Sequence, residues 1–482
     1  MSEEKSFDRR TFMRGALAAA ALAPLGGALA SCAAGGGGSA STGASSAAGG
    51  ASGAATGAAK ASADNPFGLA KGSTIDAVIF NGGYGTDYVD FAAKIVQKDH
   101  EGVTTKVSPS TQIAQELQPR FVSGNPPDLI DDSGANKIGY NAIVSQLEDL
   151  EDVVNAKNLE GKTIKDTLYP GTLDPGMFNG KMAAINYVLT IYGVWYSSSL
   201  FDQHGWQPPK TWDEAMALGK KAKAEGKYLF VWGKEAANYY EKLTVGSAIK
   251  EGGDEVRLAL GNLEPKCWSH PAIQGVFKAL EAIVKAGYVK PGGAGTQFTR
   301  AQAQWSQAEQ AILYPSGSWI ENEMKKQTKA GFKMKGFPAM TLTDHAAMPH
   351  TALHSEAAEA YIVPSKGHNP AGGKELLRTM LSKEAAANFA KTRLASTIVK
   401  GTVPADGFGS TALQSQIQML DAAGKDVFSF QFSDIYGMGA DELVLWNSFL
   451  AGNANVSDLT QGLQKITDKV RNDDSIKKIK VT

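Results

Sequence analysis

The sequence is poor in cysteine and has almost no net charge. Only two of its 482 residues are cysteines, too few for a disulfide framework or a cysteine-rich zinc module. The 48 lysines and arginines are balanced by 49 aspartates and glutamates, so the chain lacks the basic excess that nucleic-acid binding uses. No apolar run reaches the roughly 18 residues of a membrane-spanning helix. These absences favour a globular body, and the length suggests two or three domains.

Motifs of common catalytic sites are also absent. The turn Gly83–Tyr88 lacks the third glycine of a dinucleotide fingerprint, and no phosphate-binding GKS or GKT follows it. No Gly-x-Ser-x-Gly elbow occurs around Ser316. His350 and His354 have the spacing of one helical face, but the HExxH pattern of a zinc enzyme is missing. The sequence therefore predicts a protein that is not an enzyme and that holds neither a cofactor nor a metal.

The N-terminus has the features of an export signal. Arg9 and Arg10 precede a short, weakly apolar stretch that Pro24 interrupts, which is the layout of a twin-arginine signal. The following Leu29–Cys32 resembles a bacterial lipobox, in which the cysteine is acylated and becomes the new N-terminus. We predict a twin-arginine lipoprotein signal peptide over residues 1–31 and lipidation of Cys32.

A segment of very simple composition follows the lipobox. Of residues 33–65, 30 are Ala, Gly, Ser or Thr, so the segment has little apolar surface to bury. As a flexible coil of this length it would reach about 30 Å. We predict that residues 32–71 are a lipidated, disordered linker. It would hold the body at the cell membrane, on the extracytoplasmic face, by the lipid anchor only.

The rest of the chain alternates between strand-like and helix-like patterns. Thr211-Trp-Asp-Glu214 is a capping box that opens a helix, and Ile113, Leu117 and Phe121 form a helical stripe. Such alternation predicts an α/β fold with largely parallel sheets, and about 415 ordered residues predict two lobes. Strands are predicted at 75–80, 129–130, 183–185, 194–196, 229–231, 311–314 and 361–363.

Aromatic residues at strand ends and turns point to a carbohydrate ligand. A pyranose has an apolar face that stacks on a flat ring and a rim of hydroxyls that binds acid or amide groups. Trp319 follows a strand on a Gly-containing turn, as a stacking platform requires, and Asn81 and Tyr84 lie on a turn after the first strand. Further aromatics in such positions are Tyr187, Trp232, Tyr239 and Trp446.

Four stretches, residues 186–196, 200–212, 316–319 and 357–364, resemble a known family. They are similar to carbohydrate-binding lipoproteins of bacterial ABC importers, in the maltose-binding-like group. Over the whole body the sequence is most similar to members that bind N-acetylglucosamine or diacetylchitobiose.

The resemblance implies a two-lobed, type II periplasmic-binding-protein-like fold with discontinuous lobes. The first lobe would comprise residues 72–185 and 338–398, and the second 186–336 and 404–482. A three-segment hinge would join them. Its crossings are expected near Ile185–Tyr187, Gly336–Pro338 and Val399–Pro404.

The resemblance also implies the ligand site and the partners. A monomer would close around a neutral sugar and deliver it to the ABC permease subunits in the membrane, without contact to nucleic acid. The expected ligand-binding residues are Asn81, Gly82, Tyr84, Asp131, Asp132, Ser133, Tyr187, Trp232, Asn238, Tyr239, Trp319, His354, Glu356 and Trp446.

Two other functions remain open at this point. An exported glycoside hydrolase acting on chitin fragments would use the same aromatic and acidic residues, and it would cleave the sugar. A scaffold or adhesion lipoprotein would have no ligand cleft. Binding without turnover separates the solute-binding protein from both.

Overall fold

The computed structural model describes residues 59–134, 137–178 and 180–481. The export signal at Arg9 and Arg10, the lipidation site at Cys32 and most of the predicted linker lie outside the described residues. Among the residues that are described, no helix has the length and apolar character needed to cross a membrane.

One mixed sheet organises the described chain, with the strand order β2-β1-β3-β10-β6-β8-β7. Pairing is parallel among β1, β2 and β3, between β7 and β8 and between β10 and β11. Strand β6 pairs antiparallel with β8, β9 and β10, and β10 pairs antiparallel with β3. The short strands β9 and β11 pair with β6 and β10, and β4 and β5 form a separate hairpin. The strands are β1 Thr74–Phe80, β2 Thr104–Ser110, β3 Leu129–Asp131, β4 Met177–Phe178, β5 Lys181–Met182, β6 Ile185–Ser197, β7 Tyr228–Phe230, β8 Ala311–Gly317, β9 Met334–Phe337, β10 Leu353–Ile362 and β11 Val427–Phe428.

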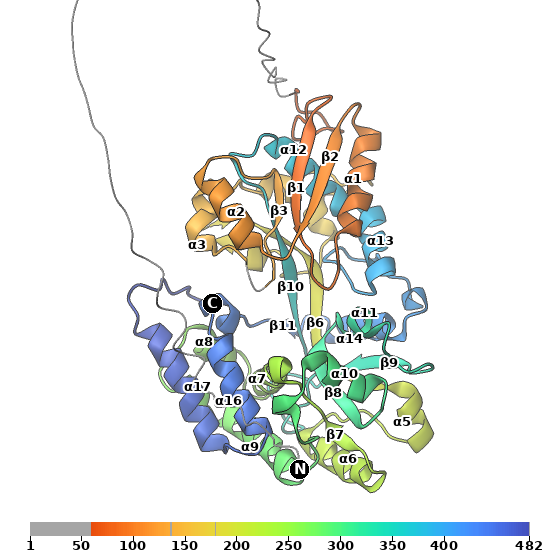
Figure 1. Ribbon diagram of the computed structural model, residues 1–482, viewed down its shortest axis with the longest axis vertical. Helices are drawn as coiled ribbons and strands as arrows, with labels where there is room; N and C mark the ends of the chain where they lie inside the picture. The colour runs from red at the N-terminus through yellow and green to blue at the C-terminus, as the bar shows by residue number, and fades with distance from the viewer. Residues whose placement is uncertain (1–58, 135–136, 179, 482) are drawn as a thin grey trace, which may run out of the picture. The chain divides into compact units, whose positions relative to one another are not determined.

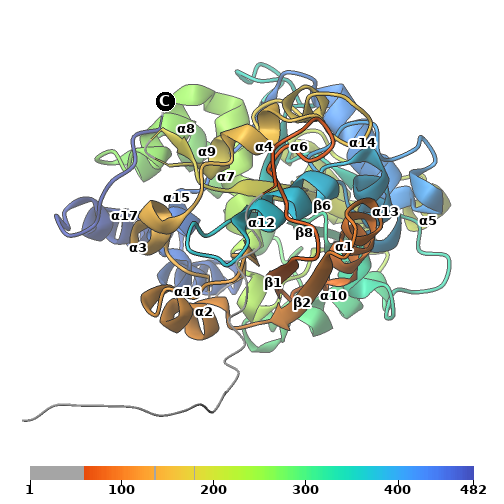
Figure 2. The same ribbon diagram turned by 90° about the horizontal axis from the view of Figure 1, so that it is seen from above.

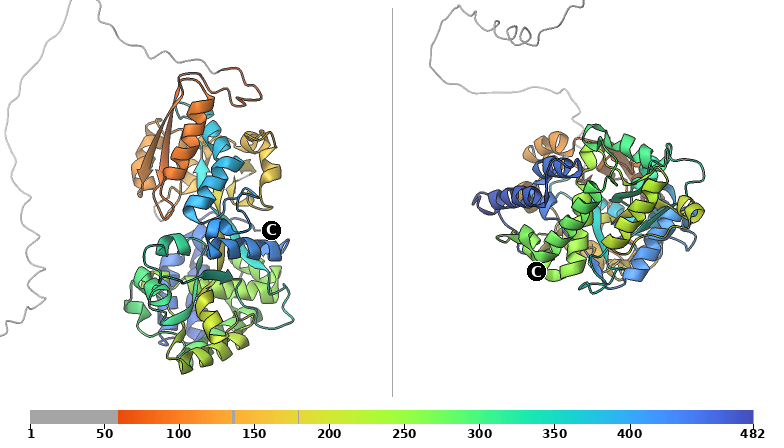
Figure 3. Two further views of the ribbon diagram at one scale, coloured as in Figure 1. Left: turned by 90° about the vertical axis from the view of Figure 1, so that its right-hand side faces the viewer. Right: turned by 90° about the horizontal axis from the view of Figure 1, so that it is seen from below.

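Helices cover both faces of the first half of the sheet, around β1, β2 and β3. Side chains of a strand alternate between faces, so Ile75 and Ile79 of β1 pack on the α1 side, whereas Val78 packs with Leu117 of α2. Figure 3 shows α1 beside α13 on one side of this half. The helices are α1 Asp87–Asp99, α2 Ile113–Val122, α3 Tyr140–Ile143, α4 Glu151–Asn155, α12 Pro370–Met380 and α13 Lys383–Arg393.

The second half surrounds β7, β8 and β9 and has its own apolar core. Thr211 caps α6 as predicted, accepting a hydrogen bond from the Glu214 amide, while the Glu214 carboxylate accepts one from the Lys210 amide. Figure 2 shows α16 and α17 packed side by side. The helices are α5 Ser198–His204, α6 Trp212–Ala224, α7 Tyr239–Gly252, α8 Asp254–Gly261, α9 Pro271–Lys285, α10 Phe298–Ser306, α11 Ile320–Met324, α14 Thr411–Ala423, α15 Phe432–Tyr436, α16 Gly439–Leu450 and α17 Val456–Arg471.

The long strands β6 and β10 join the two halves (Figure 1). The first part of β6 pairs with β10 through Ile191, and the part from Tyr192 onward pairs with β8. A third segment crosses nearby, because the Ile398 amide donates to the Tyr187 carbonyl. The crossings expected at Ile185–Tyr187 and near Val399 thus fall on segments that lie side by side.

The remaining crossing was expected at Gly336–Pro338, but the chain does not pass between the halves at these residues. Gly336 belongs to β9, which pairs with the far end of β6. The chain after β9 stays with the second half, because the buried Lys250 ammonium donates to the carbonyls of Ala339 and His350. We therefore place the return crossing in β10 and assign residues 338–352 to the second half.

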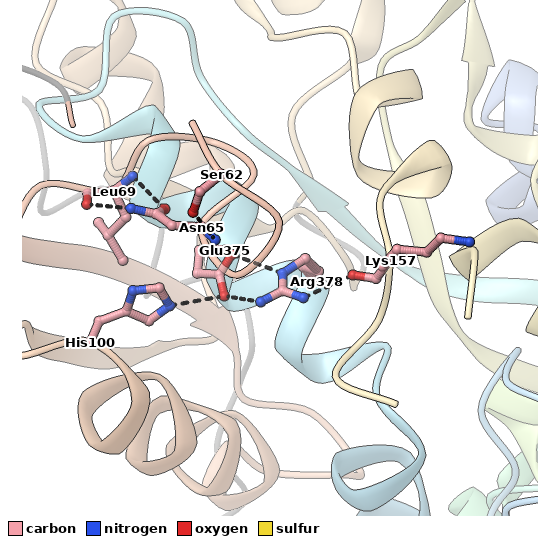
Figure 4. A network of polar contacts seen from close by, with 7 residues as sticks. All are labelled: Ser62, Asn65, Leu69, His100, Lys157, Glu375 and Arg378. Atoms are coloured by element: carbon pink, nitrogen blue, oxygen red, sulfur yellow. Dashed lines mark hydrogen bonds and ion pairs between the residues drawn. The ribbon is translucent and has the colours of Figure 1, made fainter. Parts of the chain in front are cut away.

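We expected the ordered body to begin at residue 72, but the structure is already ordered before that residue. The Asn65 side chain bonds both the amide and the carbonyl of Leu69, and Leu69 itself is buried (Figure 4). Gly68 has φ +70°, and a Cβ there would lie 2.3 Å from the Ala59 carbonyl oxygen, so this turn requires glycine.

A buried ion cluster lies close by in the first half. Arg378 donates to both oxygens of Glu375, at 2.9 and 2.6 Å, and also to the Lys157 carbonyl (Figure 4). His100, at the end of α1, lies 3.1 Å from the same carboxylate. Both the Glu375 and Arg378 side chains are almost fully buried, so the cluster ties α12 to α1 and to the loop at Lys157.

Candidate functional site

Three aromatic rings form a wall in the second half of the fold. Trp319 follows β8 at the start of α11, and its ring folds back over Gly317, where a Cβ would lie 2.0 Å from it. The ring centroid of Trp319 lies 5.8 Å from that of Tyr192 and 5.9 Å from that of Tyr239. Trp319 and Tyr239 are partly exposed. The arrangement presents a flat ring with polar hydroxyls beside it, which suits a sugar face.

An ion pair network lies behind these rings. Burial alone raises the pKa of Glu356, but the positive charge of Lys242, with contacts from His354 and Tyr192, outweighs burial and lowers this pKa to about 2. The Lys242 ammonium also lies 3.0 Å from a carboxylate oxygen of Asp434. Glu356 and Lys242 are therefore both ionised at neutral pH.

His354 is held as a neutral ring within this network. Its ring stacks between those of Tyr192 and Phe430, at centroid distances of 4.5 and 4.2 Å. Burial lowers its pKa, against the opposing effect of Glu356. Among the described residues, no group of three His, Cys, Asp or Glu side chains is arranged to hold a metal ion.

A small pocket lies against the same rings. Its volume is about 10 Å³, which is room for about one water molecule. Strands β6 and β8, helix α7, the loop after β9 and the start of β10 supply its lining, which consists of Tyr192, Gly193, Tyr239, Lys242, Leu243, Pro315, Ser316, Ala339 and His354.

The turn after β1 carries the residues expected on the opposite wall. Asn81 is exposed and Gly82 is partly exposed, with a Cβ position at Gly82 that would collide with the Phe80 ring. Tyr84 is buried, and its hydroxyl makes no hydrogen bond. Asn322 of α11 donates to the Gly83 carbonyl at 2.7 Å, so this turn and the helix that starts at Trp319 are in contact.

Acidic residues gather where β3 ends. Ser133 donates to Asp131 at 2.5 Å, the Ile138 amide donates to Asp132 at 2.7 Å, and each carboxylate keeps one buried oxygen without a partner. Burial raises the pKa of Asp132 to about 6. Burial and the neighbouring Glu359 raise the pKa of Asp131. Glu359 of β10 has a left-handed backbone (φ 55°), and burial raises its pKa to about 7.

Replacing Glu359 should change how stability depends on pH. Since its folded pKa of about 7 exceeds the ordinary 4.5, its contribution to stability is complete below pH 4.5 and is lost as the pH rises to 7. In Glu359→Gln we expect the free energy of unfolding to fall less over this range, by about 1–3 kcal/mol, than in the unsubstituted chain. Urea titrations at pH 4.5, 6 and 8 measure this difference. Parallel pH profiles of the two proteins would contradict it.

Three residues expected at the site lie in the core instead. Tyr187 is buried among Tyr88, Tyr361 and Phe389. Trp232 is buried and donates to Asn447, and Trp446 is buried and donates to Glu241. Tyr187 lies within β6, Trp232 follows β7 and Trp446 lies within α16, and each ring packs into the core.

The other expected residues lie at or near the two walls, and further ones join them. Asn238 stands at the start of α7, next to Tyr239, with a buried side-chain oxygen that lacks a partner. Four residues near the rings were not expected there: Tyr192, Lys242, Ser316 and Asp434. Tyr192 and Ser316 lie inside the stretches that carry the family resemblance, so the sequence could have indicated that they belong to the site. No pattern in the sequence indicated this for Lys242 or Asp434.

Comparison with known proteins decides the family. Residues 68–387 match the family described as bacterial extracellular solute-binding protein. The chain belongs to this family of solute-binding proteins. The resemblance found in the sequence is confirmed.

One relative matches almost the whole chain of this solute-binding protein. It is the diacetylchitobiose binding protein NgcE of Streptomyces coelicolor, 58% identical over 477 residues, which cover 99% of each protein.

Solved structures show the same fold at lower identity. RafE from Streptococcus pneumoniae in its apo form has a TM-score of 0.65 at 18% identity, covering 82% of this chain and 97% of RafE. A chitin oligosaccharide binding protein has a TM-score of 0.64 at 16% identity, covering 83% and 98%. The predicted two-lobed α/β fold of type II is thereby confirmed.

Proposed function

We propose that this solute-binding protein captures diacetylchitobiose or a closely related N-acetylglucosamine sugar outside the cytoplasm and delivers it to an ABC permease. The observation that carries the proposal is the 58% identity, over 99% of both chains, to a protein named for diacetylchitobiose binding. The aromatic wall around Trp319 and the ionised Glu356 fit such a ligand in chemical terms, since a sugar offers an apolar face and a polar rim.

Capture would occur by closure of the two halves around the sugar. The strands β6 and β10 and the segment near Ile398 connect the halves, so small changes along them would move one wall relative to the other. A ligand that touches both walls binds the closed form more tightly and shifts the population toward it. No bond of the sugar would change on this chain, and ATP hydrolysis would belong to a partner.

Calorimetry on the full chain in detergent tests the proposal. The panel consists of diacetylchitobiose, N-acetylglucosamine, cellobiose and maltose. We expect micromolar or tighter binding of diacetylchitobiose and much weaker binding of maltose. Absence of binding to both N-acetylated sugars would refute the proposed ligand, whereas hydrolysis of diacetylchitobiose during the titration would favour the glycosidase.

The N-terminus supports a proposal about location. Arg9 and Arg10 would direct export by the twin-arginine route, and the acylated Cys32 would hold the mature protein on the outer face of the cell membrane. Residues after Cys32 would separate the binding body from the lipid surface. The protein would act as a monomer, with membrane contact through the anchor only.

Replacing Cys32 should release the protein from the membrane. In Cys32→Ala the acyl chains have no attachment atom, so we expect the protein to move from the detergent phase to the aqueous phase in a two-phase extraction of cells. Cys267→Ala is the matched control, because Cys267 is the other cysteine and is buried in the second half. An unchanged distribution of the Cys32 variant would disprove lipidation there.

A further inference from the structure

Two segments from different halves of the fold meet beside the aromatic wall. The turn after β1, residues 81–85, belongs to the first half, and α11 belongs to the second. The side-chain amide of Asn322 in α11 donates a hydrogen bond to the Gly83 carbonyl at 2.7 Å. The two residues lie 239 positions apart in the sequence, so the approach of the two halves is what brings them together.

Helix α11 is fixed to the second half on both sides of Asn322. The Ser410 hydroxyl donates to the Glu321 carboxylate at 2.5 Å, and the Gln302 side chain of α10 donates to the Glu323 carboxylate at 2.7 Å. Because both neighbours of Asn322 are held in this way, the helix moves together with the second half.

The turn after β1 is fixed to the first half. The Asn81 amide donates to the Ser110 carbonyl at 2.8 Å, which ties the turn to the end of β2. The Tyr84 ring is buried, and its centroid lies 5.3 Å from that of the Phe389 ring of α13. The hydrogen bond from α11 to this turn therefore joins two firmly held segments, and it breaks when the halves separate.

The same helix follows directly on the aromatic platform. Trp319 lies at the start of α11, three residues before Asn322. A sugar that stacks on Trp319 and touches the first half favours the arrangement in which Asn322 reaches Gly83. The bond itself ends on a backbone carbonyl and uses no sugar atom, so its contribution is the same for every sugar that closes the protein.

We propose that Asn322 is a latch residue, whose hydrogen bond to Gly83 stabilises the closed form and slows the release of bound sugar. The proposal rests on the proposed function and adds to it, because it assigns part of the closing free energy to one bond between the halves. Asn322 is thus a positioning residue. Its bond also forms without sugar and biases the free protein toward the closed form.

Stopped-flow tryptophan fluorescence of the full chain in detergent tests the latch with diacetylchitobiose and N-acetylglucosamine. In Asn322→Ala we expect the dissociation rate of both sugars to rise by one common factor of about 2- to 10-fold, the worth of one neutral hydrogen bond. The association rate should stay unchanged, because sugar enters the open form. Asn322→Asp turns the donor into a carboxylate that faces the Gly83 carbonyl, and it should speed dissociation at least as much.

Asn262→Ala is the matched control for these variants. The Asn262 side-chain amide also donates to backbone carbonyls, those of Leu258 and Val481, but both lie in the same half as Asn262. We expect its rates to equal those of the unsubstituted protein, and thermal melting of all variants monitors folding.

Spin labels provide a measurement that needs no sugar. Gln97→Cys on α1 and Lys220→Cys on α6 place one label on an exposed position of each half, while Cys267 is buried and stays unlabelled. Electron paramagnetic resonance then gives the distribution of distances between the labels. We expect Asn322→Ala to shift this distribution in the sugar-free protein, because the closed form loses a bond.

The outcomes separate the latch from the proposed function. Faster dissociation by one factor for both sugars, at unchanged association rates, supports the latch. An unchanged dissociation rate in Asn322→Ala, or factors that differ between the two sugars, overturns it and leaves the proposed function standing. If the unsubstituted protein binds neither sugar, the proposed function fails, and the label distances decide the latch, which identical distributions with and without Asn322→Ala would overturn.

Discussion

Trp319→Ala weakens binding of diacetylchitobiose by a factor of about 10–100 while the protein stays folded. Removing the indole deletes the stacking surface, and loss of an aromatic contact in a binding site costs about 1–3 kcal/mol. The Trp319 ring is partly exposed and packs against Tyr192 and Tyr239, so its loss opens little of the core. Calorimetry measures the affinity, and circular dichroism checks the fold.

Two variants serve as controls for this result. Trp319→Phe keeps an aromatic face and should retain most of the affinity. Tyr288→Ala removes another partly exposed ring, which lies beside Lys223 in the same half of the fold, and should leave the affinity unchanged. Full affinity in Trp319→Ala would show that the sugar does not stack there.

Glu375→Ala lowers the free energy of unfolding by about 3–5 kcal/mol. Arg378 would keep its buried position without its charge partner, and an unpaired buried charge is expensive. The bond between His100 and the same carboxylate would also be lost, which detaches the end of α1 from α12. Urea denaturation measures the change.

Glu101→Ala gives the matched control, because Glu101 pairs with Lys71 on the surface of the same half. Both of these side chains are about three-quarters exposed, and such ion pairs contribute little. We expect a change below about 1 kcal/mol. The double variant Glu375→Ala with Arg378→Met should recover part of the lost stability, since it removes the unpaired charge. If the Glu375→Ala protein were as stable as the Glu101→Ala protein, the buried ion cluster would not contribute to the stability of the fold.

The sequence was sufficient to predict the fold class and most central strands. Apolar runs such as Ile75–Phe80 are buried on both faces, so they can be recognised as strands in the sequence. Strand β2 gave no such signal, because its Thr104–Ser110 sequence is polar and forms the edge of the sheet. Two runs read as separate strands, at 183–185 and 194–196, belong to or border the single long strand β6.

The site was harder to predict than the fold, for a physical reason. A turn after a strand predicts where a residue lies in the fold, but it does not predict whether the side chain points into a cleft or toward a neighbouring helix. Trp319 and Trp446 both looked available, yet Trp446 is fully buried against Phe277. Lys242 was missed because it lies within α7 and is brought to Glu356 only by the long-range packing of that helix on the sheet.

The central claim is that the protein holds a sugar and releases it unchanged. Equilibrium dialysis of the full chain against diacetylchitobiose, followed by denaturation and chromatography of the released sugar, measures both parts at once. We expect about one molecule of intact disaccharide per chain at saturation. Recovery of N-acetylglucosamine monomers, or of no bound sugar at all, would contradict the account.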